Sequence, residues 1–80
     1  MRLDKYLKNS RLIKRRTVAK DACEDGKVCL NGKPAKPGTE VKAGDIVEVI
    51  FGERSVKVEI TDISDNATKA AAREMYRVIE

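Results

Sequence analysis

The spacing of apolar residues predicts two short helices at the start of the chain. Leu3 and Leu7 stand four positions apart and give one apolar face to a helix over residues 2–8. In a second predicted helix, over residues 15–25, small apolar residues recur at one-face spacing: Val18, Ala19, Ala22 and Cys23. Gly26 follows as the expected left-handed terminator. Because these apolar residues are small, the second helix can pack closely against its neighbours.

From residue 27 the pattern becomes that of short strands joined by tight turns. Residues 28–30 lead into Asn31-Gly32, a dipeptide that adopts the positive φ of a two-residue hairpin at low cost. Residues 33–35 then return as a partner strand. Pro34 has no N–H to donate to a ladder, so this partner is expected at the edge of the sheet.

Two longer strands and a helical segment are predicted in the second half. Residues 46–51 are the strongest strand, and residues 56–63 alternate apolar with polar positions as a half-buried antiparallel strand does. Asp65-Asn66 opens a final Ala-rich helical segment. The pattern leaves open whether residues 76–79 continue that helix or extend along the sheet.

Together these elements predict an α+β fold. Two N-terminal helices pack on a small, mainly antiparallel sheet, with a short C-terminal helical segment. With 80 residues the chain is expected to be one small unit, divided into a domain over residues 1–64 and a C-terminal extension over residues 65–80 packed on it.

Positive charge is concentrated at one end of this chain. The first twenty residues carry eight Lys or Arg and one acid, Asp4, a net charge of +7. The remaining sixty carry nine bases and twelve acids, a net charge of −3. Clustering of this kind is typical of a site for a polyanion such as nucleic acid. Aromatic residues make up only 4% of the chain, too few to stack several bases in a row.

The residue types argue against several other classes. The chain has no histidine, the usual general base near neutral pH, and no glycine-rich phosphate loop. Cys23 and Cys29 are six apart, which is not a paired-ligand spacing for zinc, so neither metal nor cofactor is expected. The charged N-terminus does not resemble a signal peptide, and no apolar run is long enough to span a bilayer, so a cytoplasmic protein without membrane contact is expected.

The start of the second predicted helix is the strongest candidate for a phosphate site. A helix N-terminus presents unpaired N–H groups, and Arg15 and Arg16 add two guanidiniums that grip phosphate oxygens in pairs. Asp4 is expected to orient a neighbouring arginine through a salt bridge. Lys33, at a hairpin tip, is either an ordinary turn residue or a further contact beside the helices. The full set of predicted RNA-binding residues is Arg2, Lys5, Lys8, Arg11, Lys14, Arg15, Arg16, Lys20 and Lys33.

Several spaced motifs occur in order along residues 1–50. They are Arg2-Leu3-Asp4-x-x-Leu7, Arg15-Arg16-Thr17-x-Ala19, Gly26-x-Val28, Asn31-Gly32 and Val41-x-x-Gly44-Asp45-x-Val47. This series resembles the S4 RNA-binding domain, which occurs in ribosomal protein S4, some pseudouridine synthases and tyrosyl-tRNA synthetases. One departure is Arg15, which stands where the family usually has Ser and puts the cap of the second helix in question.

Among stand-alone S4 proteins, the chain resembles the RqcP family of Gram-positive bacteria. Residues 1–8, residues 10–17 and Met75-Tyr76 carry this likeness. It implies a protein that binds the large ribosomal (50S) subunit obstructed by peptidyl-tRNA, contacts 23S rRNA and the tRNA, and helps hold the tRNA in the P site. Separately, the small apolar inventory leaves little for a dimer face, so a monomer is expected. The resemblance also implies a partner, an RqcH-like factor that directs C-terminal alanine tailing of stalled chains. The alternative is a general rRNA-binding S4 protein of ribosome assembly or of 50S recycling after heat shock, as the longer heat shock protein 15 suggests.

Two other classes of protein fit this sequence less well than an RNA-binding domain. An RNA-modifying enzyme with an S4 domain would need a catalytic domain, for which this length leaves no room. A β-grasp-like carrier would need a flexible Gly-Gly terminus, whereas this chain ends Val78-Ile79-Glu80. The sequence therefore favours a non-enzymatic RNA-binding domain.

Overall fold

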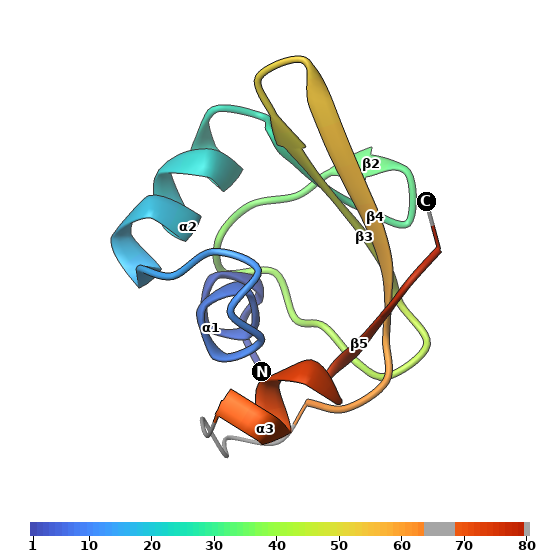
Figure 1. Ribbon diagram of the computed structural model, residues 1–80. Helices are drawn as coiled ribbons and strands as arrows, with labels where there is room; N and C mark the ends of the chain where they lie inside the picture. Colours follow the sequence, from blue (N-terminus) through green and yellow to red (C-terminus); the bar gives the residue numbers. More distant parts are fainter. Residues whose placement is uncertain (64–68, 80) are drawn as a thin grey trace.

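The computed structural model describes residues 1–63 and 69–79, and within them the helices lie on one side of an antiparallel sheet (Figure 1). The strands follow the spatial order β2-β1-β3-β4-β5. The described elements are α1 (Leu3–Asn9), α2 (Arg16–Glu24), β1 (Val28–Leu30), β2 (Lys33–Pro34), β3 (Ile46–Phe51), β4 (Arg54–Ile60), α3 (Lys69–Arg73) and β5 (Tyr76–Val78). The predicted α+β arrangement of two N-terminal helices on a small antiparallel sheet is confirmed.

Helix α1 is the centre of the core. Leu3, Tyr6 and Leu7 are all fully buried, so Tyr6 belongs to the core together with the two leucines that the sequence pattern identifies. The loop over residues 36–40 covers the start of this helix, because the Leu3 N–H donates to the Thr39 carbonyl at 2.8 Å. The predicted helix at residues 2–8 is thus confirmed to within one residue.

Helix α2 packs on α1 along a narrow line of small residues. Ala19 and Cys23, four apart, are buried, as their spacing predicts. Val18 was expected on the same face, but it is 49% exposed. The expectation was wrong because a short helix that contacts the core through one i, i+4 pair turns its flanking positions outward. Gly26 ends the segment at φ +75°, which confirms the predicted terminator.

The first hairpin matches its prediction closely. Asn31 and Gly32 adopt φ values of 53° and 87°, the two positive angles that a two-residue hairpin turn of this kind requires. The Asn31 amide oxygen accepts the Ile46 N–H at 2.9 Å, which fixes the turn to the start of β3. Strand β2 lies at the edge of the sheet, as Pro34 predicts.

Strands β3 and β4 form the long hairpin that backs the helices. Val47, Val49, Val58 and Ile60 are buried, so the alternating positions of both strands face the core. Strand β4 covers Arg54–Ile60, not residues 56–63, because Phe51 pairs with Arg54 directly across a two-residue turn. After Ile60 the chain leaves the sheet, and the Thr61 N–H donates to the Met75 carbonyl at 2.9 Å.

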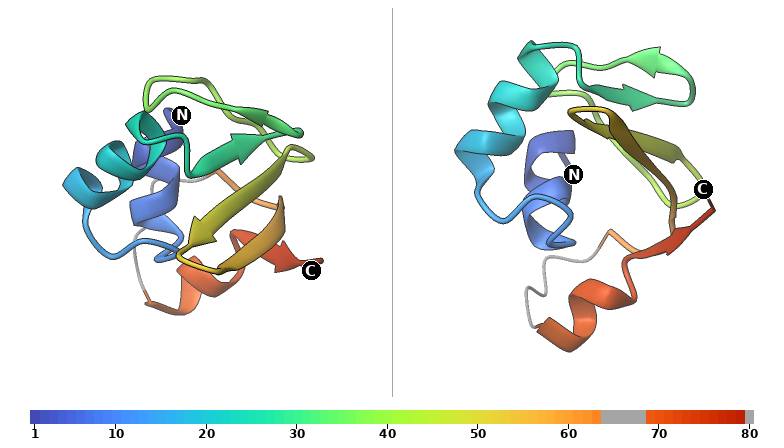
Figure 2. Two further views of the ribbon diagram at one scale, coloured as in Figure 1. Left: turned by 90° about the horizontal axis from the view of Figure 1, so that it is seen from above. Right: turned by 45° about the horizontal axis from the view of Figure 1, so that its top comes forward.

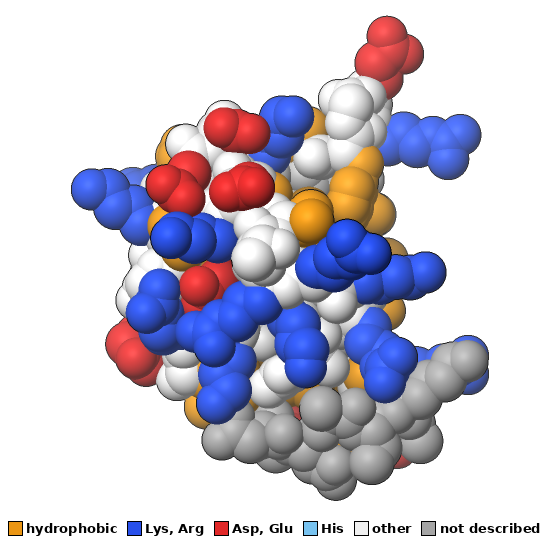
Figure 3. Space-filling model, turned by 90° about the vertical axis from the view of Figure 1, so that its left-hand side faces the viewer, with side chains coloured by type: hydrophobic (Ala, Val, Ile, Leu, Met, Phe, Trp, Pro, Cys, Tyr) orange, Lys and Arg blue, Asp and Glu red, His pale blue; other side chains and the backbone are white. Residues whose placement is uncertain are grey.

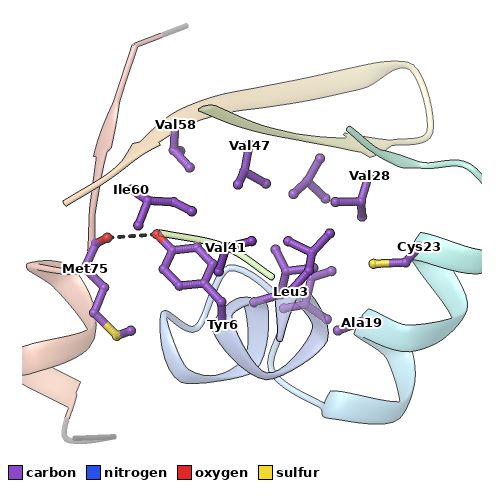
Figure 4. Packing of buried hydrophobic residues seen from close by; sticks show 13 residues of the cluster. Leu3, Tyr6, Ala19, Cys23, Val28, Val41, Val47, Val58, Ile60 and Met75 are labelled. Atoms are coloured by element: carbon purple, nitrogen blue, oxygen red, sulfur yellow. Dashed lines mark hydrogen bonds between the residues drawn. The ribbon is translucent and has the colours of Figure 1, made fainter. Parts of the chain in front are cut away.

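The C-terminal segment returns to the core and the sheet. Met75 is fully buried, and its carbonyl accepts the Tyr6 hydroxyl at 2.8 Å (Figure 4). Strand β5 then pairs with β4, which answers the question left open for residues 76–79: Tyr76–Val78 extends along the sheet. The predicted helix start at Asp65-Asn66 lies outside the described residues. The boundary between residues 64 and 65 remains a prediction.

The helices of this fold are short. The longest helix in the described part, α2, has nine residues, and none there has the length and apolar character needed to cross a bilayer.

Candidate nucleic-acid interface

The bases of the first twenty residues lie on the helical side of the molecule. Seen from that side, Lys and Arg side chains form a band across the surface, with a group of acidic side chains at one margin (Figure 3). All the predicted site residues in α1, α2 and their connection are exposed except Lys5, which is half-buried. These side chains are therefore accessible to solvent, and shared contacts bring Arg2 together with Arg16 and with Lys20.

Asp4 is the buried anchor of this surface. Its side chain is 3% exposed, and its Oδ1 lies 3.3 Å from Arg2 Nε and 3.6 Å from Arg16 Nη2. The two arginine side chains are about half exposed, at 51% and 49%. The Asp4 carboxylate thus contacts two guanidiniums, one from the residue before α1 and one from the start of α2, and both remain accessible to solvent. The predicted structural role of Asp4 is confirmed.

The position of the Asp4 carboxylate is itself fixed. Its Oδ1 accepts the Lys5 N–H at 2.8 Å, and its Oδ2 accepts a hydrogen bond from Arg2 Nη2 at 3.3 Å. The backbone N–H of Asp4 donates to the Pro37 carbonyl at 3.1 Å. These contacts hold the charge at the start of α1, where a helix favours an acid.

The same carboxylate influences a neighbouring thiol. Burial, with added repulsion from Asp4 and then Glu24, raises the pKa of Cys23 to about 11. A thiol with this pKa stays protonated near neutral pH, so it is a weak nucleophile and a poor metal ligand. Cys23 therefore acts here as a small core residue, in agreement with the sequence interpretation.

The connection between the helices is held in place by two anchors. Ile13 is 6% exposed, and its N–H donates to the Leu7 carbonyl at 3.1 Å. Ser10 donates its hydroxyl to the same carbonyl at 3.2 Å. Arg11 lies between these anchors at φ 62°, a left-handed conformation. The connection thus presents Arg11 and Lys14 outward on a backbone that is held at both ends.

The start of α2 carries cations and no side-chain cap. Arg15 occupies the capping position in an extended conformation, and its side chain makes no capping hydrogen bond. The first N–H groups of a helix have no intrahelical partner, so they can donate to an anion such as a phosphate. Arg15 at this position thus adds a second guanidinium beside Arg16 and supplies no capping side chain.

The structure adds one base that the sequence interpretation missed. Lys36 lines an open groove of about 720 Å³ together with Arg2 and Lys20. The hydrogen bonds from the start of α1 to Pro37 and Thr39 bring this loop against the helices. No local pattern distinguishes Lys36 from the other loop lysines. We call the exposed set Arg2, Lys8, Arg11, Lys14, Arg15, Arg16, Lys20 and Lys36 the basic face.

Lys33 is not part of this grouping. It begins β2, at the tip of the first hairpin, and that tip points away from α2 in Figure 1 and in the views of Figure 2. A contact of Lys33 with RNA remains a prediction, but it would have to be made apart from the helices.

Within the described residues, no group of three or more His, Cys, Asp or Glu side chains could hold a metal ion. What the surface offers chemically is anion binding. Guanidiniums, ammoniums and helix N–H groups match phosphate oxygens in charge and hydrogen-bonding capacity.

Comparison with known proteins identifies the family to which this chain belongs. The S4 domain family matches residues 1–47. The RQC P-site tRNA stabilizing factor of Listeria monocytogenes is 55% identical over 80 residues, covering 100% of this chain and 87% of the relative. The factor of the same name from Bacillus subtilis is 45% identical over 80 residues, covering 100% and 93%.

A solved structure shares the whole fold. The trimeric structure of heat shock protein 15 from Vibrio cholerae aligns with a TM-score of 0.90 at 36% identity, covering 99% of this chain and 81% of the other. The comparisons thus agree with the arrangement of helices and sheet described above. The chain belongs to the S4 domain family and, within it, to the family of RQC P-site tRNA stabilizing factors.

Proposed function

We propose that this chain is a non-catalytic RNA-binding factor of ribosome-associated quality control. It binds the large ribosomal subunit that carries peptidyl-tRNA and stabilises the tRNA in the P site. Relatives of nearly the same length that carry this function in their names support the assignment. The structural observation that carries it is the Asp4 junction, which holds Arg2 and Arg16 side by side at the solvent surface.

The composition of the basic face suits structured RNA. Double-stranded RNA offers backbone phosphates and 2′-hydroxyls, which a surface of cations can bind without reading bases. If about 4–6 phosphates are contacted, the logarithm of affinity falls against the logarithm of salt concentration with a slope of roughly −3 to −5. The sheet then serves as the support on which both helices are packed.

The RNA contacts are proposed to come from the whole helical surface. They include the predicted bases of α1, α2 and their connection, and Lys36 extends the surface along the loop that covers α1. Lys5 contributes from a half-buried position. Lys33 would serve as a separate contact at the hairpin tip.

The partners follow from the family resemblance. The proposed RNA partners are 23S rRNA and peptidyl-tRNA on the 50S subunit, and the protein partner is an RqcH-like factor during alanine tailing. The chain acts in the cytoplasm, where ribosomes translate, and binds as a monomer.

Co-sedimentation tests this proposal. The chain is mixed with 30S subunits, empty 50S subunits and 50S–peptidyl-tRNA complexes across a salt series, beside an Arg15→Ala/Arg16→Ala variant. The matched control, Lys57→Ala/Arg77→Ala, also removes two cations. Lys57 and Arg77 pair with β3 and β4 residues on the sheet, outside the basic face.

We expect preference for the tRNA-carrying 50S complex, a loss of more than tenfold in affinity for the Arg15/Arg16 variant, and retention in the control. Equal binding to empty and tRNA-carrying 50S subunits would instead favour the alternative of a general rRNA-binding S4 protein. Binding to neither subunit would contradict both assignments.

A further inference from the structure

An open groove lies beside the basic face, between α2 and the end of β3. Its volume is about 640 Å³. Helix α2 and the turn that follows it contribute residues 18, 21, 22 and 25, which share one face of the helix. The opposite wall is the last part of β3, with Ile50 and Phe51. We call this the α2–β3 groove.

The groove holds the most exposed aromatic ring of the chain. Phe51 is 45% exposed, whereas Tyr6 is fully buried and Tyr76 is partly buried. Val18, 49% exposed, faces the same groove from α2. Two large apolar side chains thus remain accessible at one groove, and hydrophobic atoms are visible beside the basic band in Figure 3.

Charge varies along the groove. Lys14 and Arg15, which belong to the basic face, line it at the start of α2. Asp21 and Asp25 line it along the later part of the same helix and its end, and Lys27 lines it just beyond. The two bases give the first end a charge of +2, whereas the two acids and Lys27 give the second end a net charge of −1. An anionic ligand would therefore place its charge beside Lys14 and Arg15 and its neutral part further along.

A nucleotide has this division of charge. We propose that the α2–β3 groove binds one unpaired base of the RNA held by the basic face, with the base stacked on Phe51 and its phosphate beside Lys14 and Arg15. The inference rests on the proposed function and adds base stacking to a surface otherwise limited to phosphate contacts. One accessible ring suits a single base, in keeping with the low aromatic content of the chain.

Two features favour a base over an apolar peptide in this position. The groove is continuous with the basic face through Lys14 and Arg15, so the bound RNA passes its opening. The carboxylates of Asp21 and Asp25 can also accept hydrogen bonds from the N–H groups on the edge of a base. A purely apolar side chain would offer those carboxylates no hydrogen-bond donor.

Ultraviolet cross-linking of the full chain bound to 50S–peptidyl-tRNA complexes tests the proposal. Mass spectrometry of the digested complex identifies the cross-linked residue and nucleotide, and the nucleotide sequence assigns it to rRNA or to tRNA. In parallel, affinity is measured for Phe51→Leu, which keeps an apolar side chain without a ring, and for Phe51→Tyr, which keeps the ring. Thermal melts check that both variants are folded.

We expect a nucleotide cross-linked at Phe51, a roughly 5- to 150-fold loss of affinity in Phe51→Leu, and near-normal affinity in Phe51→Tyr. Normal binding of Phe51→Leu, or a cross-link from the groove to a protein, would overturn the groove assignment and leave the proposed function intact. Failure of the unaltered chain to bind any ribosomal complex would overturn both.

Discussion

Replacement of Asp4 by Asn removes the charge at the centre of the basic face and keeps the shape of the side chain. The amide oxygen of Asn can still accept the Lys5 N–H that now reaches Asp4 Oδ1 at 2.8 Å. The electrostatic attraction to Arg2 and Arg16 is lost, so both guanidiniums become free to move. The variant therefore keeps both arginines and removes only the charge that positions them.

The stability cost should be modest. Both arginines are about half exposed, so each pair is partly screened by solvent. We estimate a loss of about 1–2 kcal/mol in the free energy of unfolding for the two pairs together. For a chain of this size, that corresponds to a fall in melting temperature of about 5–15 °C.

The effect on RNA affinity is a balance of two opposing terms. Ordering each arginine on binding costs about 0.5–1.5 kcal/mol, and the Asn variant must meet that cost twice. Removing a negative charge about 8 Å from a phosphate gains only about 0.5 kcal/mol in water. The first term is larger, so we expect affinity to fall roughly threefold to sixtyfold.

Equilibrium binding to 50S–peptidyl-tRNA complexes at one fixed salt concentration measures this effect. Glu24→Gln is the matched control, because it removes one acid from the exposed end of α2 and so reports the general gain from added positive charge. If Asp4→Asn bound RNA as tightly as Glu24→Gln, or more tightly than the unaltered chain, the reasoning about arginine positioning would be refuted.

Two further predictions concern the core. Tyr6→Phe should lower the free energy of unfolding by only about 0.5–1.5 kcal/mol in urea titrations, because the Met75 carbonyl that loses the hydroxyl keeps backbone N–H donors; a loss above about 3 kcal/mol would contradict this. The raised pKa of Cys23 means that the native state retains a proton that the unfolded chain loses between about pH 9 and 11, so stability should fall by about 2–3 kcal/mol as pH rises through that range. Cys23→Ala should remove this component, and identical pH slopes for both proteins would show that the thiol does not titrate as expected.

Features with a local cause could be predicted from the sequence. The Asn31-Gly32 turn and the helix end at Gly26 follow from residues that tolerate positive φ, and the structure has positive φ at all three. The edge position of β2 follows from the missing N–H of Pro34. These predictions needed no knowledge of distant contacts.

Features that depend on distant segments were missed or left open. Val18 fits a helical apolar pattern, but its burial depends on how widely α1 contacts α2. The strand at Tyr76–Val78 depends on an available edge at β4. Lys36 joins the basic face only because its loop covers the start of α1. Conversely, the sequence allowed Lys33 to lie beside the helices, but this residue belongs to a hairpin that is directed away from them.

The helical surface, not the sheet, is expected to bind ribosomal RNA. An electron cryomicroscopy structure of the full chain on a 50S–peptidyl-tRNA complex would test this directly. We expect α1, α2 and the loop at Lys36 to lie against RNA, with Arg2 and Arg16 at phosphates and the outer face of the sheet turned away. RNA packed against the outer face of the sheet or along β5, with the Asp4 junction facing solvent, would contradict it.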